Sequence, residues 1–167
     1  MSTNITDYLD VRERLAALGC NVPSGFAILP VNFDSVDSIS AFRNVSEAAT
    51  VKTLLRNADL PYDDILAAGS RPPYIHNNAF EWVAPTLFIS ASLWSENPDA
   101  VSVALSTIAN YVTDFFKGFR GTSGDHWVKL DIIVERRKTA SCKKISYEGP
   151  PEGLLGLAEV IRATSDE

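Results

Sequence analysis

The sequence contains few of the side chains from which proteins build metal sites, disulfide frameworks and acid–base pairs. Its 167 residues include only two cysteines and two histidines. Cys20 and Cys142 stand far apart, without a CxxC pair or nearby histidines, whereas a zinc site needs about four closely spaced ligands. Small secreted scaffolds also carry more cysteines than this. We therefore expect no metal, no cofactor and no disulfide framework.

Long apolar runs and targeting signals are missing as well. No stretch reaches the roughly 18 apolar residues that cross a bilayer as a helix. The opening residues, MSTNITDYLDVRERL, lack the charged-then-apolar order of a secretory signal. We expect a soluble protein of the reducing cytoplasm that has no membrane partner.

Positive charge is scarce, because 15 Lys and Arg stand against 21 Asp and Glu, which leaves a net charge of −6. An acidic chain repels nucleic acid unless its basic groups gather on one face. One basic cluster begins at Arg136 and ends at Lys144, around an expected hairpin turn. Basic residues there also protect a sheet edge from aggregation. Nucleic acid is a disfavoured partner, and an accessory role through this cluster ranks third among our hypotheses.

Material for a core is plentiful, since 46% of the residues are hydrophobic. This content suits one globular domain, which we predict to span residues 1–167, with residues 164–167 as a loose polar tail. Hydrophobic periodicity predicts the element order α-β-α-α-β-α-β-β-α. The expected helices are residues 7–18, 46–58, 61–68, 98–117 and a C-terminal helix over Leu154 to Ile161. The expected strands are residues 25–32, 80–94, 127–136 and 142–148.

These elements predict an α/β (α+β) sandwich of about four strands with helices packed on it. Residues 86–94, TLFISASLW, carry bulk on both faces, as a central strand covered on both sides does. Residues 127–136 alternate between apolar and polar, which favours an antiparallel strand with one wet face. With residues 142–148 they predict a C-terminal antiparallel hairpin. Gly19 is placed to end the first helix, and Ser46 to cap the second.

Two stretches look like sites. GFRGTSGDHW, residues 118–127, holds glycines and an Asp125–His126 pair. Its glycines follow a helix instead of preceding one, and neighbours in a strand point to opposite faces, so we expect a connector. RPPYIHNN, residues 71–78, is expected to be an irregular loop fastened by prolines. The acidic group Asp59, Asp63 and Asp64 matches no calcium loop.

The helix at residues 98–117 carries an unusually wide apolar stripe, which indicates packing on two neighbours or an interface. Our first hypothesis is therefore a non-catalytic protein that associates with itself or serves as an accessory subunit of a larger partner. Its expected partner-binding residues are Arg71, Tyr74, His76, Trp94, Tyr111, Phe115 and Phe119. The alternative is a small enzyme or ligand-binding domain, with a pocket near Arg71, Tyr74, His76, Asp125 and His126.

Overall fold

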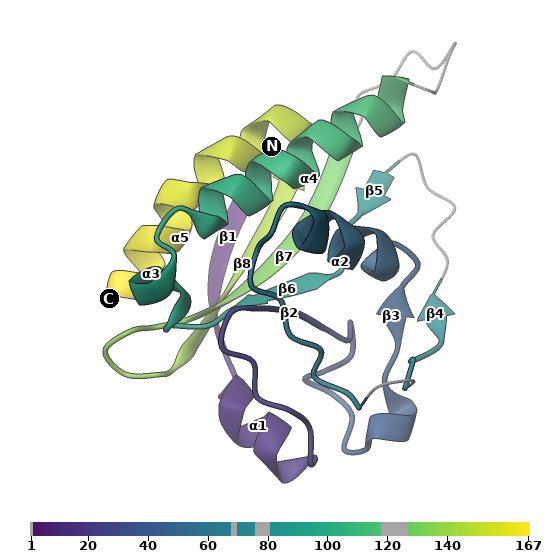
Figure 1. Ribbon diagram of the computed structural model, residues 1–167, viewed down its shortest axis with the longest axis vertical. Coiled ribbons are helices and arrows are strands. Elements are labelled where there is room, and N and C mark those ends of the chain that lie inside the picture. The colour runs from purple at the N-terminus through teal and green to yellow at the C-terminus, as the bar shows by residue number, and fades with distance from the viewer. Residues whose placement is uncertain (1, 68–69, 76–80, 118–126) are drawn as a thin grey trace.

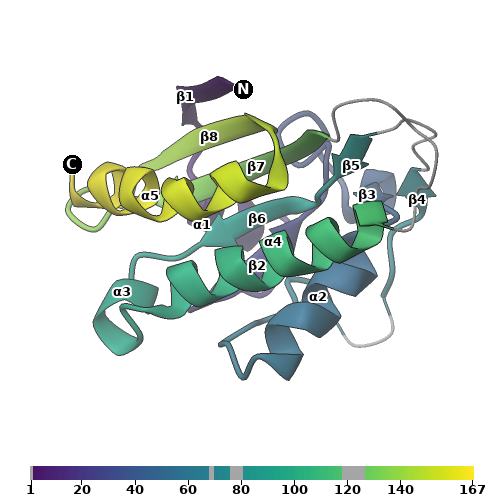
Figure 2. The same cartoon turned by 90° about the horizontal axis from the view of Figure 1, so that it is seen from above.

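The computed structural model describes residues 2–67, 70–75, 81–117 and 127–167. Over these residues the chain has an α+β fold, which confirms the predicted fold class. A mixed sheet lies between helices, and a small second sheet stands beside it (Figure 1). Figure 2 shows helices α2, α4 and α5 side by side on one face of the main sheet.

The main sheet has six strands among the described residues, in the order β1-β8-β7-β6-β2, with β5 also paired to β7. Strands β6 and β7 are parallel, as are β5 and β7, and the other pairs are antiparallel. The strands are β1 (Ser2–Tyr8), β2 (Phe26–Leu29), β5 (Glu81–Val83), β6 (Thr86–Ile89), β7 (Trp127–Glu135) and β8 (Cys142–Gly149). The small sheet pairs β3 (Asn44–Val45) with β4 (Tyr74–Ile75) in parallel.

The helices surround this sheet. They are α1 (Val11–Ala17), α2 (Ala48–Asn57), α3 (Leu93–Glu96), α4 (Ala100–Lys117) and α5 (Leu157–Asp166), with short 3-10 turns η1 (Ile39–Ala41) and η2 (Pro151–Gly156). Asp10 caps the start of helix α1, and its carboxylate accepts a hydrogen bond from the Glu13 amide (3.1 Å). It ends as predicted at Gly19, which takes a φ of 74° that glycine adopts without strain. Local sequence therefore sets both ends of α1.

Two apolar clusters lie on opposite faces of the sheet. The larger one joins α2, α4, η2 and α5 to the sheet, and the smaller one joins α1 and residues 33–42 and 65 to its other face. Strand β6 contributes Leu87 and Ile89 to the first cluster and Phe88 to the second. The predicted coverage of this central strand on both sides is confirmed.

The antiparallel hairpin of β7 and β8 is also confirmed, with Asp131 opposite Ser146. Its wet face is limited to the first half of β7, where Lys129 is exposed. Further along, Ile133 and Glu135 are buried, because the smaller cluster covers that end of the strand. The alternation was read correctly, but it did not reveal which half would be covered.

Most of the apolar surface of helix α4 is buried within the fold. It packs against α2 on one side and against η2 and α5 on the other, with the sheet beneath. Its buried residues are Ala100, Val101, Ala104, Leu105, Ile108, Ala109, Val112 and Phe116. Of the two readings of this stripe, packing on two neighbours therefore accounts for most of it, and Val103 and Phe115 are its exposed large hydrophobic residues.

Five local expectations differ from the structure. Residues 2–8 form strand β1, so the first helix begins at Val11 and not at residue 7. Residues 61–67 are not helical, because Pro61 and Asp63 bond instead to the backbone of Phe26 in β2. The three other differences concern the ends of single elements.

Residues 93–96 turn into helix α3, so the strand of this region ends at Ile89 and not at residue 94. At the C-terminus, α5 continues to Asp166 and buries Thr164 and Ser165, where a loose tail was expected. Ser46 does not cap α2, since Glu47 occupies the N-cap position and no side chain bonds there. Burial in the tertiary structure accounts for the two boundaries at α3 and α5, whereas the Ser46 hydroxyl makes a local bond to the Glu47 carboxylate (3.1 Å).

Candidate functional site

A cleft of about 350 Å³ opens between α2 and residues 64–67 and 70–72. Its apolar floor includes Ile28, Pro30 and Ile65, and Tyr74 of β4 lies at its rim. Figure 1 shows α2 and the β3–β4 sheet on the same side of the molecule. We call this feature the cationic cleft, after the charged residues Lys52, Arg56 and Arg71 that line it.

Two of these cations come from one face of α2. Lys52 and Arg56 are four residues apart, the spacing that aligns side chains on a helix. The Lys52 ammonium lies 5.8 Å from the centre of the Tyr62 ring, and the Arg56 guanidinium carbon lies 5.5 Å from it. Cations at this distance are attracted to the ring face. The half-buried Tyr62 ring therefore makes a cation–π contact with each of the two side chains.

Asp64 is the acidic residue of the cationic cleft. Its carboxylate lies 2.8 Å from the Lys52 ammonium and 3.3 Å from an Arg56 nitrogen. Burial, followed by the charge of Asp64, raises the pKa of the Tyr62 hydroxyl. Asp64 therefore holds two cations in place.

Arg71 and Asn44 complete the polar lining. Arg71 is exposed and takes part in no ion pair with the described residues. The side-chain oxygen of Asn44 is buried and accepts no hydrogen bond within the described chain. Buried polar atoms are nearly always hydrogen-bonded in folded proteins. The cleft thus presents three cations against one carboxylate, together with an acceptor that has no partner in the described part of the chain.

The structure separates the predicted partner-binding residues. Arg71 and Tyr74 both line the cationic cleft, and Tyr74 is 43% exposed. Phe115 is exposed on α4, where its ring stacks on the half-buried Tyr111 at 6.5 Å. Two of the seven predicted residues, His76 and Phe119, lie outside the described residues.

Trp94 requires a correction. Its side chain is only 6% exposed, because α3 turns it into the larger apolar cluster. The guanidinium carbon of Arg162 lies 5.8 Å from its ring. Trp94 is therefore a core residue and not part of a contact surface. Asp125 and His126 of the alternative pocket lie outside the described residues.

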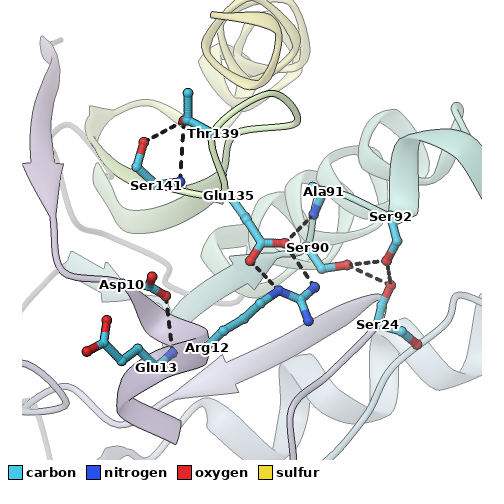
Figure 3. A network of polar contacts seen from close by, with 10 residues as sticks. All are labelled: Asp10, Arg12, Glu13, Ser24, Ser90, Ala91, Ser92, Glu135, Thr139 and Ser141. Atoms are coloured by element: carbon cyan, nitrogen blue, oxygen red, sulfur yellow. Dashed lines mark hydrogen bonds and ion pairs between the residues drawn. The ribbon is translucent and has the colours of Figure 1, made fainter. Parts of the chain in front are cut away.

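A second polar network lies where the parallel strands β6 and β7 end (Figure 3). Glu135 is buried, and its carboxylate accepts two hydrogen bonds from Arg12 (2.5 and 3.0 Å) and one from the Ala91 amide (2.9 Å). Nearby, the Ser90 and Ser92 hydroxyls both donate to the Ser24 carbonyl (2.6 and 2.8 Å).

This position in a sheet often holds ligands, but here the groups are already engaged with one another. Sequence reasoning placed Glu135 on the wet face of its strand. Only the position of Glu135 at the end of its strand could have suggested that it is buried. The network fastens α1 to the sheet, and we assign it a structural role.

The basic cluster is largely neutralised. Arg137 pairs with Asp166 (2.7 Å), Lys144 with Asp131 (3.8 Å), and Lys143 with Asp7. Arg136 approaches Glu167 (3.9 Å). These pairs weaken the case for nucleic acid, because a phosphate backbone would have to compete with them.

Three further findings concern metal sites, membrane-spanning helices and similarity to known proteins. In the described ranges no group of three His, Cys, Asp or Glu residues is placed to hold a metal ion. None of the described helices combines the length and apolar character needed to cross a bilayer. No protein-family model, no curated protein and no solved structure matches the chain.

Proposed function

We propose that this chain is a non-catalytic protein that binds another protein, and that the cationic cleft receives an acidic segment of that partner. The observation that carries the proposal is the charge of the cleft. Lys52, Arg56 and Arg71 gather around a single carboxylate in a chain whose net charge is −6. The cleft is locally positive although the whole chain is negative, and this favours a ligand that carries carboxylates.

The rim of the cleft supports a protein ligand over a small anion. Tyr74 and Ile75 of β4 are 43% and 44% exposed. Tyrosine and arginine are among the residues that contribute most to protein interfaces. An acidic segment that also carries an apolar side chain would pair its charges with Arg71 and cover Tyr74.

The buried oxygen of Asn44 supports the same reading. It accepts no hydrogen bond from the described residues, and Asn44 lines the cleft. A bound peptide carries an N–H group at almost every residue, which can donate to such an acceptor. A lone carboxylate ion carries no such donor.

The cleft offers little for catalysis. Asp64 is committed to two ion pairs, and the lining contains no histidine or cysteine among the described residues. A general base needs a free lone pair within reach of a substrate proton. The enzyme alternative therefore draws no support from the cationic cleft.

Panning a random peptide library on the purified chain tests the proposal. We expect the selected peptides to be enriched in Asp and Glu. A synthetic peptide of this set, measured by titration calorimetry, should bind about tenfold more weakly to Arg71→Glu, a loss of about 1.4 kcal/mol. The matched control is Lys138→Glu, the same change of charge at an exposed residue of the β7–β8 turn.

A second pair of variants separates the two exposed aromatic positions. Tyr74→Ala should weaken binding of the peptide, and Phe115→Ala should leave it unchanged. Peptides without acidic enrichment, or equal losses in Arg71→Glu and Lys138→Glu, would contradict the proposal. Saturable binding of inorganic phosphate without binding of any peptide would favour the ligand-binding alternative.

A further inference from the structure

Strand β1 forms one end of the main sheet, and no described element lies beyond its outer edge (Figure 2). It pairs with β8 along its whole length, from Ser2 opposite Glu148 to Tyr8 opposite Cys142. Residues 2–7 are all exposed. The outer edge of β1 therefore presents backbone N–H and C=O groups to solvent.

The opposite end of the sheet is covered. The Phe26 amide of β2 donates to the Pro61 carbonyl (2.9 Å), and the Asp63 amide donates to the Phe26 carbonyl (3.0 Å). Residues 61–63 thus occupy part of the outer side of β2. Of the two ends of the sheet, β1 is the more open.

Strand β1 lacks the features that usually keep an edge from pairing. Edge strands are protected by lysine, proline, bulges or short length. The sequence STNITDY contains no basic residue and no proline, and its register with β8 runs without a bulge. Its one charged residue, Asp7, is paired with Lys143. Threonine, isoleucine and tyrosine, which favour extended structure, occupy four of the seven positions of the strand.

We propose that two copies of this chain associate through β1, as an antiparallel pair centred on Ile5. In this register Ile5 faces Ile5 of the second copy, Thr3 faces Asp7, and Asn4 faces Thr6. The same residues are used on both sides, so a two-fold axis closes the assembly and no further copy adds.

The side chains of β1 complement one another in this register. Ile5 is 48% exposed, although it lies opposite the fully buried Ile145 and therefore on the core-facing side of the sheet. Pairing places it against its equivalent and extends the apolar layer across the axis. No like charges oppose each other, because Asp7 faces Thr3.

The expected association is weak and depends on salt. One pair of strands is small beside a standard interface of about 1,600 Å², so we expect a dissociation constant on the order of tens of micromolar. Each copy carries a net charge of −6. Salt screens this repulsion, so the dimer should strengthen as ionic strength rises.

Sedimentation equilibrium over a range of concentrations tests the association. We expect the average mass to rise from monomer toward dimer in the wild-type chain, and to stay at monomer in Ile5→Lys. The control is Val22→Lys, at a residue 43% exposed in the loop before β2, which should still dimerise. Circular dichroism verifies the fold of both variants. A wild-type chain that remains monomeric throughout overturns the proposal.

Crosslinking tests the register and does not depend on the lysine variant folding. In a Cys20→Ser background, Ile5→Cys should form an intermolecular disulfide, because Cβ atoms of directly opposed residues lie about 5 Å apart. Thr3→Cys should not, since it lies on the same face but about 13 Å from its equivalent, at about 3.4 Å per residue. Equal crosslinking of both variants, or crosslinking of neither, overturns the proposed pairing.

Discussion

Arg12 and Glu135 form a two-point ion pair across 123 residues of sequence. The arginine side chain is 40% exposed, whereas the glutamate is 1% exposed. A third hydrogen bond reaches Glu135 from the Ala91 amide. Helix α1, strand β7 and the turn that follows β6 therefore meet at one buried carboxylate.

Removal of Arg12 should destabilise the fold strongly. Arg12→Ala leaves Glu135 buried with a single hydrogen bond, and breaking one partner of a buried pair costs about 3 kcal/mol. The matched control is Arg137→Ala, which breaks the more exposed pair with Asp166 and should cost less than about 1 kcal/mol. Chemical denaturation measures both free energies of unfolding. Equal losses in the two variants would show that the Arg12–Glu135 pair contributes no more than a surface pair.

Gly25 should not tolerate a side chain. A Cβ atom there would lie 2.5 Å from the Pro61 carbonyl oxygen, which is backbone and cannot turn aside. Gly25→Ala should therefore cost about 1 to 3 kcal/mol, as overpacked positions do. Gly156→Ala is the control, because nothing lies within 4 Å of its Cβ position. Thermal unfolding should show a lower midpoint for the first variant and an unchanged or higher one for the second.

The stability of the fold should fall at alkaline pH partly because of Cys142. Burial raises the pKa of its thiol from 9.0 to about 11. Above pH 9 the unfolded chain therefore loses this proton while the folded chain keeps it, which favours unfolding. The contribution is present below pH 9 and is lost between pH 9 and about 11.

Comparison with Cys142→Ala isolates this effect. The raised pKa of Tyr62 acts in both proteins and cancels in the comparison. The raised pKa of Tyr8 nearly cancels, because burial is its largest cause and the charge of Cys142 is a small one. Wild type should lose about 2 kcal/mol more than the variant over this interval, since one pKa unit is about 1.4 kcal/mol. Denaturation curves at several pH values measure the difference. Parallel pH profiles would contradict the assignment to Cys142.

The two sides of α4 should respond differently to truncation. Ile108 is fully buried in the larger cluster, and Val103 is 41% exposed. Ile108→Ala should cost about 3 kcal/mol through lost contacts and a cavity. Val103→Ala should change stability by no more than about 0.5 kcal/mol. A large loss at Val103 would instead indicate that this side of α4 is covered in solution, and sedimentation of the same variant would show whether a second copy covers it.

Much of the architecture follows from local patterns. The apolar periodicity of α4, the alternation of β7 and the two-sided bulk of β6 each predicted an element that the structure contains. These patterns are readable because a helix or strand repeats its buried face at a fixed spacing. Gly19 ends α1 for an equally local reason, its backbone conformation.

The cationic cleft could be predicted only in part. Arg71 and Tyr74 stood out in a loop rich in proline, and both line the cleft. Lys52 and Arg56 did not, because charged residues on a helix are normally a solvated face. Their meeting with Asp64 depends on how residues 61–67 run beside β2, which no local pattern encodes.

The amino-acid sequence by itself determined the α+β class, the long helix and the closing hairpin, since these arise from contacts between near neighbours in the chain. The tertiary structure decided that residues 2–8 join the sheet, that Trp94 is buried, and that Glu135 is a buried anchor. Those outcomes depend on contacts between residues that are remote in sequence. The packing of the whole chain sets these contacts, and they produce no periodic pattern in the sequence.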